Sequence, residues 1–185
     1  MRRPAFLLFL AALLLAGASS ARAQQGFALK GHYLFNKSSV STERTDTFPD
    51  ADGFGVGAEI VLPMGIGVGV SGYTSGGVSD FEVETSSLTV LAEASYFLRL
   101  PLLPVSPYAG VHAGLGRYSK EDLNDPQRPT IKDSRTQLGF QAGVRVQLSS
   151  FLGVDAQYRR VSTSAAEDQE GNLERNQYLL GVTLF

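Results

Sequence analysis

The segment TQLGFQAGVRVQL, residues 136–148, sorts its side chains into two sets with a period of two residues. The even-numbered positions carry Thr, Leu, Phe, Ala, Val, Val and Leu, and the odd-numbered positions carry Gln, Gly, Gln, Gly, Arg and Gln. This alternation predicts a β-strand with one apolar and one polar face. A soluble sandwich or lipocalin-like periplasmic barrel would bury the apolar face, whereas a membrane barrel would turn that face towards lipid and fill its interior with the polar one.

The N-terminus indicates export. Two arginines precede an apolar run of 12 residues (5–16), and the sequence ARA ends at Ala23. This arrangement is typical of a secretory signal peptide, and the run is shorter than the roughly 20 residues that cross a bilayer as a helix. We therefore predict a cleaved signal peptide at 1–23 and one domain at 24–185, with a retained N-terminal anchor as the alternative. Since the chain has no cysteine, it can be neither an acylated lipoprotein nor a disulfide scaffold.

The charge balance bears on partners. Cleavage after residue 23 would remove three arginines and no acidic residue, leaving 13 basic and 18 acidic side chains. Proteins that bind nucleic acid usually show a basic excess. The acidic excess therefore argues against a nucleic acid partner.

Eight alternating segments recur through the rest of the chain, and almost nothing has the period of an amphipathic helix. Many of them have about the nine to eleven residues that a tilted strand needs to cross a membrane. The predicted strands are 27–35, 54–62, 66–73, 88–98, 108–118, 136–148, 152–160 and 177–185.

The connections between these segments alternate in length. Those at 63–65, 100–107 and 149–151 are short or rich in proline, and the others are long and polar. Both chain ends fall on the side of the short connections. This order is typical of an up-and-down outer-membrane barrel, with tight periplasmic turns and longer external loops. The long connections are 36–53, 74–87, 119–135 and 161–176.

Aromatic residues gather near the strand ends, which predicts two girdles at the membrane surfaces. The girdle near the short turns would contain Phe27, Tyr96, Tyr108, Phe151 and Phe185, and the girdle near the long loops would contain Phe35, Phe54, Tyr73, Tyr118 and Tyr178.

The N-terminal signal, SPYAGVHAGLGRY (106–118), TQLGFQAGVRVQL (136–148) and YLLGVTLF (178–185) together resemble the small eight-stranded, porin-like outer-membrane barrels of the OmpA and OmpX type. The resemblance implies an all-β, antiparallel, up-and-down transmembrane barrel over 24–185, located in the bacterial outer membrane. It implies a structural or surface-interaction role, with outer-membrane lipid, lipopolysaccharide and the barrel-assembly machinery as partners. It also implies that Phe185 is the assembly signal, although Leu184, not Phe185, stands on the apolar register of the last segment.

The same alternation directs three acidic and three basic side chains into the barrel. An eight-stranded barrel is only wide enough for side chains to fill it, and a buried charge is costly unless it is paired. We therefore predict a salt-bridged plug in which Arg145 pairs with Glu59 or Glu93; a narrow channel for ions or small solutes is the alternative. The six residues are Lys30, Glu59, Glu93, Arg145, Asp155 and Arg159.

No catalytic, cofactor or metal site is predicted. Eight-stranded lipid A deacylases carry a His and Ser pair that faces lipid, which keeps a lipid-modifying enzyme as an alternative. Here His32 and His112 are predicted to point inward, and the residues two positions on are Leu34 and Gly114. The Gly-rich match at 67–72 has no following helix to form a nucleotide site.

Basic residues near the predicted strand ends could meet the phosphates of lipopolysaccharide. They are Lys37, Lys120, Arg135, Arg160 and Arg175.

Overall fold

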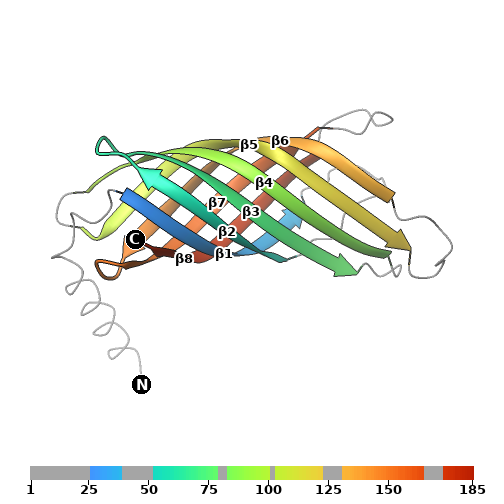
Figure 1. The fold of residues 1–185 in the computed structure, drawn as a ribbon, viewed down its shortest axis with the longest axis horizontal. Coiled ribbons are helices and arrows are strands. Elements are labelled where there is room, and N and C mark those ends of the chain that lie inside the picture. Colours follow the sequence, from blue (N-terminus) through green and yellow to red (C-terminus); the bar gives the residue numbers. More distant parts are fainter. Residues whose placement is uncertain (1–25, 39–51, 79–82, 101–102, 123–130, 165–172) are drawn as a thin grey trace, which may run out of the picture.

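The computed structural model describes residues 26–38, 52–78, 83–100, 103–122, 131–164 and 173–185. These residues form a closed barrel of eight antiparallel strands (Figure 1). The predicted signal peptide, 1–23, lies outside the described residues. Among the described residues, no helix is long and apolar enough to cross a membrane. The strands are β1 (Gly26–Ser38), β2 (Gly53–Val61), β3 (Ile66–Val78), β4 (Val83–Phe97), β5 (Val105–Asp122), β6 (Ile131–Gln147), β7 (Leu152–Thr163) and β8 (Leu173–Leu184).

Each strand pairs with its neighbours in sequence, and β1 pairs with β8 to close the sheet. The fold prediction is therefore confirmed in strand number, direction and order. The C-terminus lies at the end of the barrel that carries the short turns (Figure 1). In the turn between β2 and β3, Gly65 has a φ of 87° and donates a hydrogen bond to the carbonyl of Leu62 over 2.9 Å. A side chain is strained at that φ, which explains the glycine.

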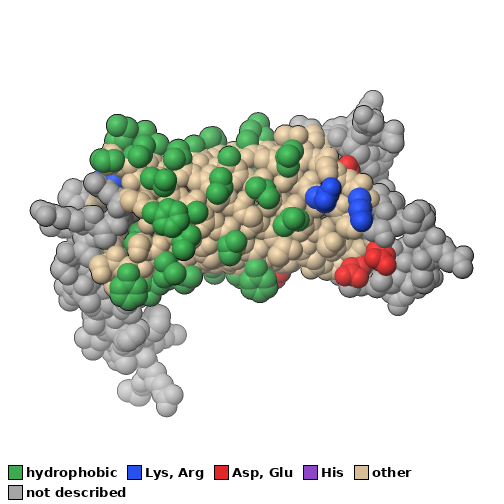
Figure 2. Space-filling view, viewed as in Figure 1, with side chains coloured by type: hydrophobic (Ala, Val, Ile, Leu, Met, Phe, Trp, Pro, Cys, Tyr) green, Lys and Arg blue, Asp and Glu red, His purple; other side chains and the backbone are tan. Residues whose placement is uncertain are grey.

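The outer surface is apolar and the interior is polar. On β6, Leu138 and Phe140 are 62% and 49% exposed, whereas Gln141 and Arg145 are each 2% exposed. Figure 2 shows apolar side chains over most of the barrel wall and charged side chains near the end opposite the C-terminus. A lipocalin-like barrel requires the reverse arrangement, so this alternative is excluded.

At the end with the long connections, β3 to β6 extend four or five residues further than the sequence predicts, and β1, β7 and β8 extend three or four. β5 has 18 residues and β6 has 17, and both continue into segments expected to be loop. Likewise, β3 continues to Val78, and β4 already begins at Val83. These extensions of β3 to β6 are polar or small on both faces except for Val78, Val83 and Ile131, so they lack the regular alternation by which the other strands are recognised. The extended ends of β3 to β6 form a protruding sheet beyond the other strands (Figure 1). We define the protruding sheet as Gly76–Val78, Val83–Ser86, Ser119–Asp122 and Ile131–Arg135.

The girdle prediction is wrong for three tyrosines. Tyr73, Tyr108 and Tyr118 are buried inside the barrel. The rings of Tyr73 and Tyr108 lie over glycines on the adjacent strand, where a Cβ at Gly55 or Gly143 would fall within 2.6 Å of ring atoms. These glycines make room for rings in the lumen. Six aromatic side chains of the predicted girdles are exposed on the outer surface, namely Phe27, Tyr96, Phe151, Phe35, Phe54 and Tyr178.

Candidate functional site: a chain of charges across the lumen

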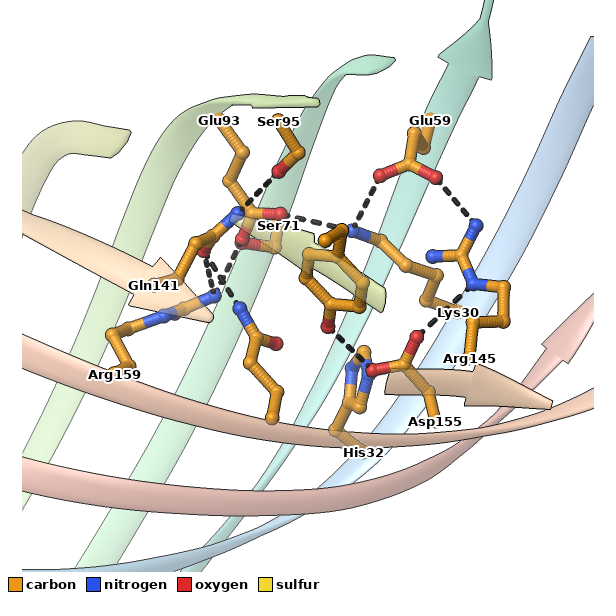
Figure 3. A network of polar contacts seen from close by, with 12 residues as sticks. Lys30, His32, Glu59, Ser71, Glu93, Ser95, Gln141, Arg145, Asp155 and Arg159 are labelled. Carbon is orange, nitrogen blue, oxygen red and sulfur yellow. Dashed lines mark hydrogen bonds and ion pairs between the residues drawn. The ribbon is translucent and has the colours of Figure 1, made fainter. Parts of the chain in front are cut away.

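Six charged side chains cross the lumen in alternating sign (Figure 3). They come from β1, β2, β4, β6 and β7, and all are buried. With three carboxylates and three cations, this set of six side chains has no formal net charge. We call this set the ion chain, and its order is Asp155, Arg145, Glu59, Lys30, Glu93, Arg159.

Arg145 joins the first three members. Its Nε donates to Asp155 Oδ2 over 3.0 Å, and its Nη1 donates to Glu59 Oε1 over 2.8 Å. The β6–β7 register places Arg145 directly opposite Asp155, which makes this pair a cross-strand neighbour. The predicted pairing with Glu59 is present, whereas the second partner is Asp155 and not Glu93.

Lys30 and Arg159 complete the ion chain. Lys30 Nζ lies 3.3 Å from Glu59 Oε2 and 2.9 Å from Glu93 Oε2. Arg159 Nη2 donates to Glu93 Oε1 over 2.7 Å. Both Glu59 and Glu93 therefore bridge two cations, so removal of any inner member leaves two neighbours with one partner fewer.

Hydroxyl groups supply further partners to the carboxylates. Tyr108 Oη donates to Asp155 Oδ1 over 2.7 Å, and the Ser71 hydroxyl donates to Glu93. Tyr73 Oη accepts a hydrogen bond of 3.0 Å from Arg159 Nη2. These residues do not belong to the predicted plug, although their alternation with inward neighbours places them in the lumen.

Amide groups and rings pack around the arginines. Gln141 Oε1 accepts hydrogen bonds from Arg159 Nη2 at 3.2 Å and from Gln157 Nε2 at 2.7 Å. The Arg145 guanidinium carbon lies 4.7 Å from the centroid of the Phe97 ring. The Arg159 guanidinium carbon lies 4.7 Å from the centroid of the Tyr73 ring. Such stacking recovers part of the cost of desolvating a guanidinium.

Both histidines point into the barrel. His32 Nε2 lies 3.6 Å from Asp155 Oδ1, and His112 is 1% exposed. A histidine placed in this way cannot reach a lipid on the outer wall. Within the described ranges, no three His, Asp or Glu side chains are grouped so that they could hold a metal ion.

Phe185 follows the last residue of β8. Its backbone N–H donates to the carbonyl of Phe151 over 3.1 Å, and its half-buried ring lies close to Gly153. Leu184 is exposed on the outer wall. Phe185 is thus off the lipid-facing register, as its sequence position predicts.

The basic residues predicted near the strand ends divide into two groups. Arg135 is buried and Arg175 is half-buried, and both guanidinium groups lie against the Tyr118 ring inside the mouth. Arg160 faces outward and forms an ion pair with Glu174. The side chains of Lys37 and Lys120 lie outside the described residues. Two exposed basic side chains were missed, Arg117 and Lys132.

Comparison with known proteins agrees with this geometry. A family model described as outer membrane protein beta-barrel domain matches residues 6–184. The crystal structure of neisserial surface protein A is similar, with a TM-score of 0.67 and 21% sequence identity over 86% of this chain and 97% of that chain. Ail, the attachment invasion locus protein of Yersinia pestis, has a TM-score of 0.59 and 17% identity, covering 87% and 99%. OprH from P. aeruginosa has a TM-score of 0.58 and 14% identity, covering 86% and 99%. No curated protein sequence matches the chain.

Proposed function

The chain belongs to the family of outer membrane protein β-barrel domains, and from this premise we propose that it is a non-conducting, non-enzymatic barrel with a structural and surface-interaction role. In this proposal residues 1–23 direct export and are removed, and residues 24–185 form the barrel. The apolar wall holds the barrel in the membrane, and the external end carries the interaction surface.

The ion chain is the observation that carries the proposal of a closed lumen. Its six side chains come from strands around the barrel and meet at distances of 2.7 to 3.3 Å. An ion that entered would have to separate paired groups or remain partly dehydrated, and both are costly in a lumen of low dielectric constant. These distances therefore support a plug more than a pore.

Single-channel recording in planar bilayers tests the closed lumen. We expect no steady conductance from the refolded wild-type protein at moderate voltage. As a positive control, a Lys30→Ala, Glu59→Ala and Glu93→Ala triple variant that still folds should show measurable current, because it opens the centre of the ion chain. Steady current through the wild-type protein would refute the plug and favour the narrow channel.

The protruding sheet supports a role outside the membrane. β5 contains 18 residues, more than the roughly nine to eleven that cross the hydrocarbon layer. No described residue pairs with the outer edge of Ile131–Ser134 on the β7 side, because the β6–β7 register begins at Gln137. Such a sheet presents both a face and a backbone edge to other molecules.

Outward basic residues support contact with lipopolysaccharide. Arg117 and Arg160 lie two residues beyond Leu115 and Tyr158, at the external end of the outer wall. Arginine forms paired hydrogen bonds with phosphate groups. An Arg117→Gln and Arg160→Gln double variant should bind purified lipopolysaccharide several-fold more weakly in detergent than Arg99→Gln, a control at the short-turn end. Equal binding by both variants would count against this partner.

We also propose that Phe185 is read by the barrel-assembly machinery. Phe185→Ala should slow insertion into membranes that contain the machinery and leave unassisted refolding into detergent close to normal. An equal slowing in both settings would instead mean that Phe185 acts only in packing against the rim.

A further inference from the structure

The guanidinium group of Arg159, at one end of the ion chain, forms hydrogen bonds through only one of its nitrogens. Nη2 donates to Glu93 at 2.7 Å, to Tyr73 at 3.0 Å and to Gln141 at 3.2 Å. Nε and Nη1 are buried and have no hydrogen-bond partner among the described residues. Nε carries one N–H and Nη1 carries two, so three donors of this buried group meet no acceptor.

Arg145, on the opposite side of the network in Figure 3, is bound more completely. Its Nε donates to Asp155 and its Nη1 to Glu59, so two of its nitrogens meet carboxylates. Arg159 is 0% exposed and, among the described acidic residues, forms an ion pair with Glu93 alone. Buried N–H groups in native proteins nearly always have a partner, which for some is a bound water or ion. The unmatched donors of Arg159 therefore indicate a site for one further acceptor.

Arg159 also lines a small cavity in the half of the lumen nearer the long loops. Ser75, Ser87 and Arg175, which lie towards the long-loop ends of β3, β4 and β8, line the same cavity. It offers the centre of a water-sized sphere about 10 Å³, which is close to the least that holds one water molecule. The cavity therefore suits a single small ligand and not a sugar or a peptide.

The polar groups that line the cavity suit a negative charge. The guanidinium groups of Arg159 and Arg175 line it, whereas none of the described lining residues is acidic. The hydroxyl oxygen of Thr89, another lining residue, accepts a hydrogen bond of 3.3 Å from Gln137 Nε2, so its hydrogen remains to donate. Hydrogen bonds that involve an ionised group are about twice as strong as those between neutral groups. An anion therefore gains more at this site than a water molecule does.

We propose that this cavity binds one monatomic, monovalent anion, with chloride as the ion to test. The anion accepts hydrogen bonds from Nε or Nη1 of Arg159, and the hydroxyl of Thr89 and the positive charge of Arg175 stabilise it further. This site goes beyond the proposed function, and it leaves the plug closed because the anion does not separate Arg159 from Glu93. Polyatomic anions such as sulfate and phosphate are too large for the cavity.

Bromide allows the site to be observed directly, since it has the charge of chloride and scatters X-rays anomalously. Crystals of the mature protein are soaked in bromide and, as a control, in gluconate at the same ionic strength. We expect anomalous density in the cavity, within hydrogen-bond distance of Nε or Nη1 of Arg159, in the bromide-soaked crystals alone. A water molecule in the cavity together with no bromide signal would overturn the inference.

Chloride affinity in solution is compared in a matched pair of variants, from the broadening of the chloride NMR signal in gluconate buffer. Arg159→Lys keeps a positive charge beside Glu93 and removes both unpartnered nitrogens, so chloride binding should weaken at least about tenfold. Arg145→Lys makes the same change at the other buried arginine, which does not line the cavity, and its binding should match wild type. Equal losses in the two variants would contradict the site.

A second pair of variants keeps the test decisive if Arg159→Lys does not fold. Arg175→Gln removes the other guanidinium group that lines the cavity and should weaken chloride binding about threefold. Arg135→Gln removes a guanidinium group that lies against the same Tyr118 ring but does not line the cavity, and it should weaken binding less. Equal weakening by these two variants would also count against the site.

Conductance separates this inference from the closed lumen. Absence of chloride and bromide binding in a barrel that passes no current would refute the anion site alone. Steady current through a wild-type barrel that holds bromide in the cavity would refute the plug and leave the anion site standing.

Discussion

The lumen and the outer surface use the same types of side chain in opposite surroundings. Arg145 lies between Glu59 and Asp155 and is almost completely buried, whereas Arg160 and Glu174 form a pair in which 46% and 49% of the side chains are exposed. In the lumen, a charge that loses its partner remains out of water. On the surface, water replaces the lost partner. The contribution of an ion pair to stability therefore depends on its surroundings as well as on its geometry.

Removal of Arg145 should have the largest effect. Arg145→Ala leaves Glu59 and Asp155 in the lumen with fewer partners, and breaking a buried pair costs about 3 to 5 kcal/mol, less if water enters. Urea unfolding of the refolded protein in detergent measures the change. Val144→Ala, on the neighbouring position of the same strand, trims only a lipid contact and should cost about 1 kcal/mol. Equal losses in the two variants would contradict the contrast between lumen and wall.

A charge on the outer wall should have the next largest effect. Val144 is exposed on the wall, and Val144→Arg would place a guanidinium in the hydrocarbon layer at a cost of about 2 to 4 kcal/mol near the midplane. Folding into bilayers of defined thickness, followed by urea titration, measures this cost. Val144→Leu serves as the control and should be close to neutral. Tolerance of the arginine would mean that this face does not meet lipid.

Loss of one hydroxyl group in the lumen should have an intermediate effect. Tyr108→Phe keeps the ring against Phe97 and removes the donor to Asp155, an interaction with a charged group worth about 1.5 to 3 kcal/mol. Tyr96→Phe makes the same chemical change on the outer surface, where we expect less than about 0.5 kcal/mol. Unfolding curves that shift equally for both variants would show that water in the lumen replaces the hydrogen bond from Tyr108 to Asp155.

The exposed ion pair should contribute least. Glu174→Gln removes the partner of Arg160 at the rim, and exposed pairs are worth about 0 to 1 kcal/mol. The shift should shrink further as salt is raised from about 10 to about 150 mM. A loss as large as that of Arg145→Ala would remove the distinction between the two regions.

The sequence predicts strand number, strand order and the faces of β6, because membrane and lumen impose opposite polarity on alternate residues. It fails where this contrast is absent. Ser119–Asp122 and Ile131–Arg135 are polar or mixed on both faces, so their strand conformation leaves no period to detect. Position near a strand end predicts that Tyr73 and Tyr108 belong to the girdles, whereas their alternation with inward neighbours indicates the lumen, where the structure places them.

Partner choice in the ion chain also lies beyond the sequence pattern. Alternation directs Arg145, Glu59 and Glu93 inward, but which carboxylate meets which cation depends on the stagger between strands. The β6–β7 register makes Asp155 the cross-strand neighbour of Arg145. Register follows from closure of the whole sheet, to which every strand contributes.

The direct test of the central claim, that the apolar face of β6 meets lipid and its polar face the lumen, is the accessibility of single spin labels along this strand. The chain has no cysteine, so single Cys substitutions at 137, 138, 140, 141, 142 and 144 can be labelled in bilayers without removing a native thiol, whereas Gly139 and Gly143 are left unchanged because a side chain there has no room. We expect collisions with oxygen, which concentrates in lipid, to rise at 138, 140, 142 and 144 and to fall at 137 and 141. The opposite phase, or equal accessibility at both sets of positions, would contradict it.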